Sequence, residues 1–182
     1  EWARKTIFGP DQTAEDFINV AETVPAGSNG LIFHPYLGGE RAPIWNAQAR
    51  GSFIGLSRNH TKPQMARSVL EGIVFNLLGA ARGLREKIGE PEALRVTGGF
   101  VRSDFVRQLI ADIFNLPVVV IKNDQSGTLA AMFLAQLGLN EEDSLDKIVK
   151  EIDDSKVYFP NNVIIPVIIV SKIPVTSLFI QL

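Results

Sequence analysis

The sequence predicts an α/β domain, and three observations support this prediction. A chain of 182 residues, 46% hydrophobic and 21% charged, can form one globular core, and this composition excludes disordered and collagen-like chains. From Leu94 onward the expected order is strand, glycine turn, helix, strand and helix, which is typical of a parallel crossover. The β-branched run Val118–Ile121 is typical of a strand covered on both faces.

The N-terminal third is expected to hold one helix and two short strands. Helical spacing over residues 11–21, with Asp11 or Thr13 as the cap, predicts the helix. Short apolar runs at 31–36 and 51–56 predict the strands.

A long amphipathic helix is expected next. Thr61-Lys-Pro-Gln64 is a capping box with proline in the first turn, and Gly89 is expected to end the helix. Arg67 and Glu71 lie one helical turn apart, which favours a structural ion pair. Apolar residues recur at steps of three and four to form one stripe, namely Met65, Val69, Ile73, Leu77, Ala80, Leu84 and Ile88.

The crossover begins with a strand at 94–97 that runs directly into Gly98 and Gly99. Ser103 or Asp104 is expected to cap the following helix. Its apolar face is predicted from Phe105, Leu109, Ile110 and Phe114.

The C-terminal part is predicted to contain helices at 127–137 and 145–152. We divide the chain into a domain at 1–160 and an atypical apolar tail at 161–182. Two prolines and a lysine in this tail argue against a membrane helix, and a changed reading frame is one hypothesis for its origin.

Composition narrows the class of function. The absence of cysteine excludes disulfides, a thiolate zinc site and a cysteine nucleophile, and two histidines make a His-rich metal site a poor interpretation. A net charge of −2 gives no electrostatic signature of nucleic-acid binding. With no initiator Met and no signal peptide, we expect a cytoplasmic protein whose sequence begins before Glu1.

The most informative candidate site is the turn from Gly98 to Ser103. Glycines between a strand and a helix let a ligand approach the backbone, and a helix N-terminus favours an anionic phosphate. The turn also lies at the carboxyl end of a strand, where ligands of α/β sheets bind. The same pattern suits a tight strand–helix connection without a ligand. Neither the P-loop nor the dinucleotide fingerprint is present.

Other chemically interesting residues have structural interpretations. Glu40 and Arg41 form either part of a polar cleft or a surface ion pair in a loop. His34 is expected to pack in the core, and His60 is expected to cap a helix. The aromatic residues expected in the core are Trp45, Phe53 and Phe75.

Four motifs occur in a fixed order along the chain. They read Phe33-His-Pro-Tyr-Leu-Gly-Gly-Glu-Arg-Ala-Pro-Ile-Trp45, Ala49-Arg-Gly-Ser-Phe-Ile-Gly-Leu-Ser57, Arg67-Ser-Val-Leu-Glu-Gly72 and Arg95-Val-Thr-Gly-Gly-Phe-Val-Arg-Ser103. Together they resemble the C-terminal half of the FGGY carbohydrate kinases over about residues 1–139. The first motif is most similar to gluconate kinases, with xylulose kinases next.

This resemblance implies an actin-like (ribonuclease H-like) ATPase domain, with a mixed, mostly parallel sheet flanked by helices. The family transfers the γ-phosphoryl group of ATP, with Mg²⁺, to a sugar or sugar-acid hydroxyl. Nucleotide contacts are implied at Gly98, Gly99 and Ser103, where Ser103 replaces an asparagine common in glycerol kinases. The chain is assigned no catalytic or metal-binding residue, because the general base and most of the sugar pocket belong to an N-terminal domain.

The resemblance therefore implies ATP or ADP and a sugar as ligands, and a chain that is inactive without that N-terminal domain. Gluconate is the leading substrate, and a xylulose or other pentose kinase is the alternative. A non-catalytic actin-like module that binds proteins is the non-enzymatic alternative. A homodimer is one candidate assembly, and neither nucleic acid nor a membrane is an expected partner.

Overall fold

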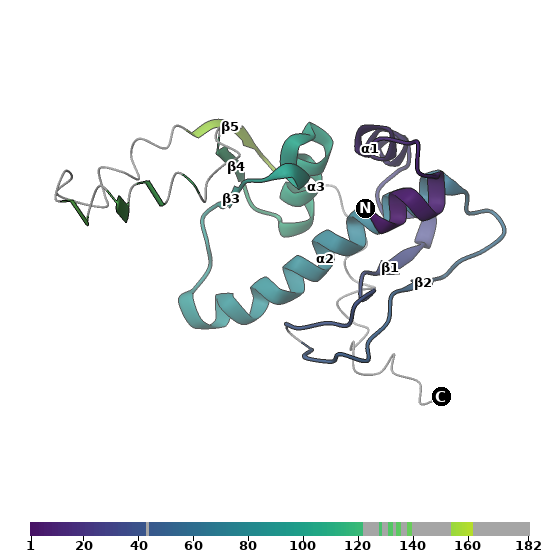
Figure 1. The fold of residues 1–182 in the computed structure, drawn as a ribbon, viewed down its shortest axis with the longest axis horizontal. Coiled ribbons are helices and arrows are strands. Elements are labelled where there is room, and N and C mark those ends of the chain that lie inside the picture. The colour runs from purple at the N-terminus through teal and green to yellow at the C-terminus, as the bar shows by residue number, and fades with distance from the viewer. Residues whose placement is uncertain are drawn as a thin grey trace.

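The computed structural model describes residues 1–42, 44–121 and 154–161, together with single positions between 128 and 139. The expected helix at 145–152 and the tail beyond 161 lie outside the described residues. Of the expected helix at 127–137, only single positions are described, and these are helical. The elements in order are η1 (Arg4–Phe8), α1 (Ala14–Glu22), η2 (Ser28–Gly30), β1 (Ile32–His34), β2 (Ser52–Ile54), α2 (Lys62–Ile88), β3 (Leu94–Val96), η3 (Gly99–Arg102), α3 (Asp104–Phe114), β4 (Val118–Ile121) and β5 (Asp154–Tyr158) (Figure 1).

The main sheet has the order β3-β4-β5. β3 pairs in parallel with β4, which confirms the predicted crossover through α3, and β4 pairs antiparallel with β5. β1 and β2 form a separate antiparallel pair. The α/β class is confirmed. Among the described strands, however, only β3 and β4 pair in parallel, whereas a mostly parallel sheet was expected. β5 was not predicted, because Asp154, Ser155 and Lys156 are polar and do not form the apolar pattern of a strand.

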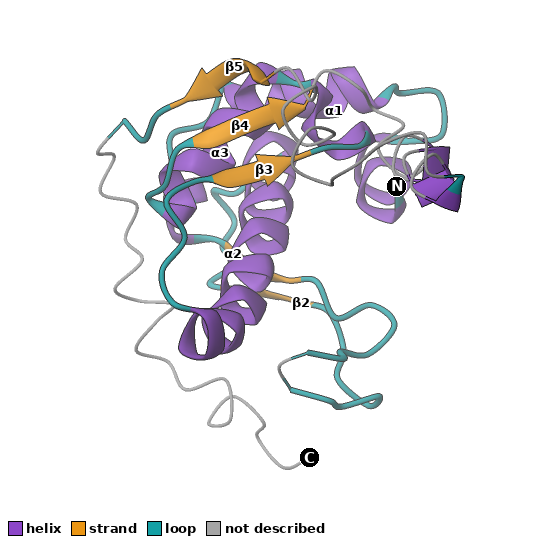
Figure 2. Cartoon of the chain, turned by 90° about the vertical axis from the view of Figure 1, so that its left-hand side faces the viewer, coloured by secondary structure: helices purple, strands orange, loops and turns teal. Residues whose placement is uncertain are grey.

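The helices α2 and α3 lie on one face of the main sheet, behind β3 and β4 in Figure 2. Along β4, Val118, Val119 and Val120 are all buried, so both faces of this strand are covered, as predicted. On α3 the completely buried residue near the start is Val106, whereas Phe105 is only partly buried.

The long helix α2 begins and ends where the sequence predicts. Thr61 donates from its backbone N–H to Gln64 Oε1 at 2.9 Å, and Gly89 follows the last turn. Gly72 is required where α2 crosses β1, because a Cβ there would lie 2.1 Å from the carbonyl oxygen of Phe33. This close approach fixes α2 against β1 and leaves its other faces for α1 and α3.

Candidate functional site

The candidate site is a turn at the carboxyl end of β3. Gly98 has φ 95° and ψ 177°, a backbone conformation that L side chains rarely adopt, so this position needs glycine. Gly99 then begins η3, a short 3₁₀ helix that sequence reasoning missed, and α3 starts after Ser103. The turn therefore joins β3 to α3 by way of one extra helical turn.

Both glycines face open space. Apart from the chain neighbours, a Cβ added at Gly98 or Gly99 would meet no atom of the described residues within 4 Å, and Gly99 is exposed. A ligand can therefore come close to the backbone at this place without displacing protein atoms. The two glycines also differ, because the φ of Gly99 lies outside the left-handed region. A side chain at Gly99 would thus be tolerated by the fold but would occupy the space in front of the turn.

Ser103 lies at the predicted N-cap position of α3, half-buried. Its hydroxyl makes no capping hydrogen bond, so the prediction of a side-chain cap is wrong although the position is right. The first acidic residue of α3 is Asp104, which follows directly. A carboxylate in the first helical turn interacts favourably with the helix dipole.

Asp104 connects the start of α3 to β5. Its Oδ1 accepts hydrogen bonds from the Tyr158 hydroxyl at 2.5 Å and from Arg107 at 2.8 Å, and its Oδ2 accepts one from Lys156 at 2.8 Å. The hydrogen bond from Lys156, followed by that from Tyr158, lowers the pKa of Asp104 to about 2. Sequence reasoning missed this cluster, because 52 and 54 residues separate Asp104 from Lys156 and Tyr158.

A second charged network lies beneath α3. Arg67 Nε is 2.6 Å from Glu71 Oε1, which confirms the predicted pair, and the two residues are only 7% and 4% exposed. Glu71 also accepts hydrogen bonds from the backbone N–H of Gly27 at 3.0 Å and from the hydroxyl of Ser28 at 2.9 Å. One buried carboxylate therefore joins α2 to the turn that precedes β1.

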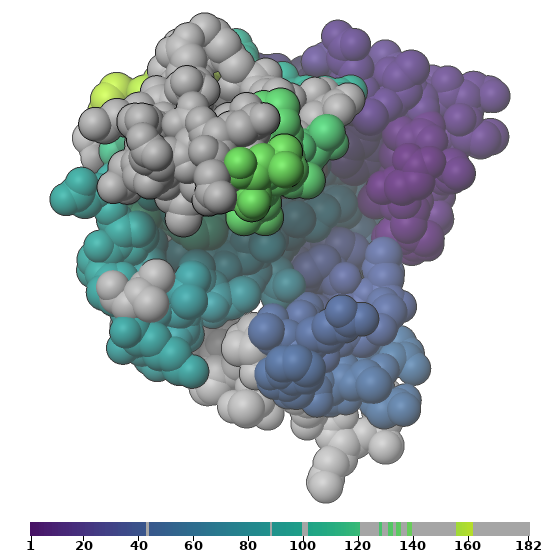
Figure 3. All heavy atoms as spheres, turned by 60° about the vertical axis from the view of Figure 1, so that its left-hand side comes forward, coloured from purple at the N-terminus to yellow at the C-terminus, as the bar shows by residue number. Residues whose placement is uncertain are grey.

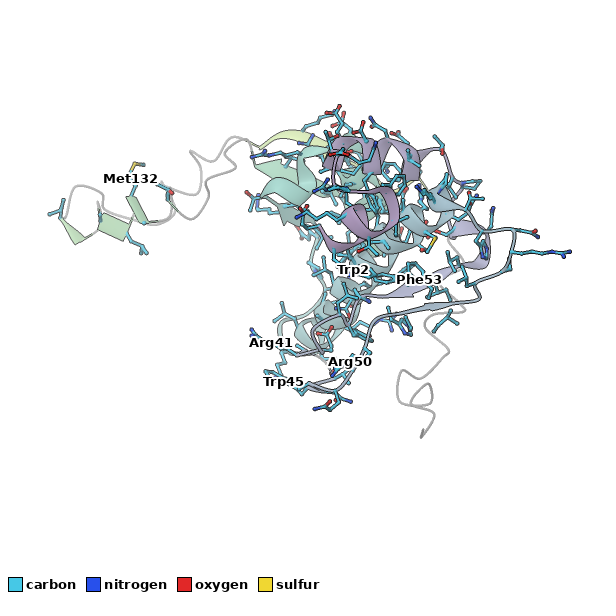
Figure 4. All side chains as sticks on the ribbon, turned by 45° about the vertical axis from the view of Figure 1, so that its right-hand side comes forward. Trp2, Arg41, Trp45, Arg50, Phe53 and Met132 are labelled. Atoms are coloured by element: carbon cyan, nitrogen blue, oxygen red, sulfur yellow. The ribbon has the colours of Figure 1, made fainter. Side chains whose placement is uncertain are left out.

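An ion pair between Glu40 and Arg41, one of the two predicted alternatives, does not form in the described part of the loop between β1 and β2. Instead, Glu40 Oε2 accepts a hydrogen bond from Asn76 Nδ2 of α2 at 3.0 Å. Trp45 is 77% exposed, so its assignment to the core is wrong. Its ring projects from the loop beside Arg41 and Arg50 in Figure 4, and Figure 3 shows the loop in blue at the lower edge of the molecule.

The other aromatic residues agree better with expectation. Phe53 and Phe75 are partly buried and pack against the core. The ring of Phe53 lies 4.7 Å from that of Phe33, and Trp2 stacks on Phe33 at 6.4 Å. Trp2 and Phe53 are both labelled in Figure 4.

The two histidines have structural surroundings. His34 stacks on Tyr36 with ring centres 5.5 Å apart, and partial burial lowers its pKa. His60 accepts a hydrogen bond from the Ser57 backbone N–H at 3.0 Å instead of capping a helix. In the part of the chain that the structure describes, no group of three or more His, Asp or Glu residues could hold a metal ion. None of the described helices is long and apolar enough to cross a membrane.

An α/β domain with a glycine turn at the carboxyl end of a parallel strand belongs to a class of fold that binds ligands at that edge. The sequence model of the FGGY family of carbohydrate kinases, C-terminal domain, matches residues 2–139, so the chain belongs to this family. The family predicted from the motifs is confirmed.

Individual relatives agree with this assignment. The chain is 45% identical over 130 residues to gluconokinase from Bacillus licheniformis, a match that covers 71% of this chain and 25% of the relative. Two solved structures from Lactobacillus acidophilus, a ligand-bound xylulose kinase and a gluconate kinase, each share 59% identity with a TM-score of 0.82. Each of these matches covers 88% of this chain and 32% of the solved chain.

A more distant structure, Plasmodium falciparum glycerol kinase with ADP, is 28% identical with a TM-score of 0.76, over 88% of this chain and 32% of that one. The chain thus spans about a quarter to a third of the length of these relatives. Gluconate and xylulose kinases are similar to it to the same degree, so similarity does not resolve the substrate.

Proposed function

We propose that this chain is the nucleotide-binding C-terminal domain of an ATP-dependent sugar kinase, with its site at Gly98, Gly99 and Ser103. The observation that carries the proposal is the open glycine turn at the carboxyl end of β3, where no described residue other than the chain neighbours has an atom within 4 Å of either glycine's missing Cβ. FGGY carbohydrate kinases use ATP, and this turn offers backbone amides to a nucleotide at a point where side chains would obstruct it.

The chemistry assigned to this domain is binding and orientation. Phosphoryl transfer depends mainly on positioning and on stabilisation of charge, and these tasks can be divided between two domains. The described residues contain no group of three or more His, Asp or Glu residues that could hold a metal ion, and we assign no metal ligand to this domain. The proton acceptor for the sugar hydroxyl is assigned to the N-terminal domain of the kinase, so this chain alone is expected to show no turnover.

Gluconate is the proposed substrate, with xylulose or another pentose as the alternative. The first motif, which ends at Trp45 and resembles that of gluconate kinases, supports this choice. A coupled assay of the intact kinase with gluconate, xylulose, ribulose and glycerol tests this choice. A kcat/KM for any other sugar that exceeds the value for gluconate contradicts it.

The nucleotide site is tested with Gly99→Val in the intact kinase. The fold tolerates this side chain, but it fills the space in front of the turn, so ADP binding should be lost in isothermal titration calorimetry. The matched control is Gly83→Val, an exposed glycine of α2 that also has open space around its missing Cβ. This variant should bind ADP normally. An unchanged ADP affinity in Gly99→Val overturns the assignment of the nucleotide site. If the wild-type kinase binds no ADP, the result favours the alternative of a non-catalytic actin-like module that binds proteins.

A further inference from the structure

A residue of α2 contacts the first turn of α3 from inside the domain. The guanidinium carbon of Arg67 lies 4.7 Å from the centre of the Phe105 ring, a distance typical of a cation–π contact. Phe105 is the second residue of α3 and follows Ser103 by two positions. Arg67 therefore touches the element that begins where the candidate nucleotide site ends.

The guanidinium is itself fixed in place. Its Nε lies 2.6 Å from Glu71, and Glu71 is in turn held by the N–H of Gly27 and the hydroxyl of Ser28, which is completely buried. Since the planar guanidinium has its position set on one side, it can serve as a rigid surface for the ring on the other. The contacts of this network thus connect the turn before β1, through α2, to the first turn of α3.

We infer that Arg67 is a positioning residue for nucleotide binding, which orients the first turn of α3 through Phe105 and so holds residues 98–103 in the conformation that receives the nucleotide. This inference rests on the proposed function. A merely structural ion pair would stabilise the fold and leave the ADP affinity of the folded protein unchanged. A positioning residue changes that affinity, because the apparent affinity for a ligand is proportional to the fraction of molecules in the binding-competent conformation.

The test uses Arg67→Lys and Phe105→Leu in the intact kinase, with ADP as the probe in calorimetry. Arg67→Lys keeps the charge near Glu71 but loses the planar face. Phe105→Leu removes the ring and keeps an apolar side chain at a partly buried position. Each variant should raise the Kd of ADP about 10-fold. The double variant should be little weaker than either single one, because both remove the same contact. In steady state, the KM of ATP should rise while the KM of the sugar stays constant.

Thr13→Ala is the matched control, because Thr13 lies outside this network. It removes the hydrogen bond that Thr13 Oγ1 accepts from the Asp16 N–H at the start of α1, so it lowers stability and leaves the Kd of ADP within about twofold of wild type. The inference is overturned if Arg67→Lys and Phe105→Leu bind ADP as tightly as wild type, or if Thr13→Ala weakens ADP binding to the same extent.

These outcomes separate the inference from the proposed function. A wild-type kinase that binds no ADP overturns both. Loss of ADP binding in Gly99→Val, combined with normal binding in Arg67→Lys and Phe105→Leu, overturns only the role of Arg67.

Discussion

Two charged networks hold the first turn of α3, and they differ in their exposure to solvent. The inner one joins Arg67 and Glu71 at 2.6 Å, with both side chains buried. The outer one joins Asp104 and Lys156 at 2.8 Å, with both side chains more than half exposed. The same type of ion pair therefore occurs in two dielectric environments beside the first turn of one helix.

This difference in exposure to solvent determines how much each ion pair contributes to stability. Removal of one partner from a buried pair leaves an uncompensated charge in a medium of low dielectric constant, which is strongly destabilising. An exposed pair is solvated in either case and is screened by salt, so it contributes little. We therefore expect the inner network to determine stability and the outer one to tune the attachment of β5.

The largest effect is expected from Glu71→Ala. This change leaves the buried guanidinium of Arg67 without its carboxylate and removes the acceptor of Gly27 and Ser28, so the free energy of unfolding should fall by about 3–5 kcal/mol. Urea denaturation monitored by circular dichroism measures it. A loss below about 1 kcal/mol would show that solvent reaches this pair and that the contrast with the outer network is not real.

A smaller loss is expected from Ser28→Ala, which removes only one donor to the same carboxylate. Glu71 keeps its bonds to Arg67 and Gly27, so the loss should be about 1–2 kcal/mol. The same denaturation experiment measures it. A loss equal to that of Glu71→Ala would contradict the view that the ion pair is the main part of the network.

The sequence predicts the residues of each network that are close together along the chain, but not their partners from other elements. The spacing of Arg67 and Glu71 by four positions is a local signal, and so is the placement of Ser103 and Asp104 before an apolar helix. Their further partners come from other elements. No local pattern indicates that Lys156 folds back onto Asp104 across 52 residues.

The same distinction applies to the rest of the fold and to the candidate site. The caps at Thr13 and Thr61, the long helix and the parallel pair β3–β4 follow local rules and were predicted. β5 pairs only because β4 offers an edge. Trp45 lies outside the core although its loop is tied to α2 by the hydrogen bond from Asn76 to Glu40. The glycine turn was predicted from two adjacent glycines, but the extra turn η3 depends on backbone angles that the sequence does not specify.

The outer network should respond weakly to mutation and clearly to salt. Asp104→Asn removes the charge that Lys156 faces but keeps polar contacts, so the loss in unfolding free energy should stay below about 1 kcal/mol. The difference from wild type should shrink further in high salt, because exposed pairs are screened. A loss in unfolding free energy that is large and independent of salt would show that this pair behaves as a buried ion pair.

The pH dependence of this pair has a defined sign. The pKa of Asp104 is held at about 2 by Lys156 and Tyr158, below its usual value of about 3.9 in an unfolded chain. The stabilisation is therefore complete above about pH 4 and is lost as the pH falls toward 2. The difference in unfolding free energy between wild type and Asp104→Asn should decrease over this interval. A difference that stays constant from pH 5 to pH 2 would contradict the assigned hydrogen bonds.

The smallest effect on stability is expected at Ser103, which lies at the N-cap of α3 between the glycine turn and the outer network. Because its hydroxyl makes no capping bond, Ser103→Ala should change the unfolding free energy by less than about 0.5 kcal/mol. Thr13→Ala is the matched control, because Thr13 Oγ1 does accept the N–H of Asp16 at 3.0 Å, and this change should cost about 1 kcal/mol. If the proposed nucleotide contact exists, Ser103→Ala should still weaken ADP binding by about 1 kcal/mol, near a fivefold rise in Kd. Equal stability losses in the two variants would show that Ser103 acts as a cap, and an unchanged Kd for ADP would limit the nucleotide contact to the backbone of the turn.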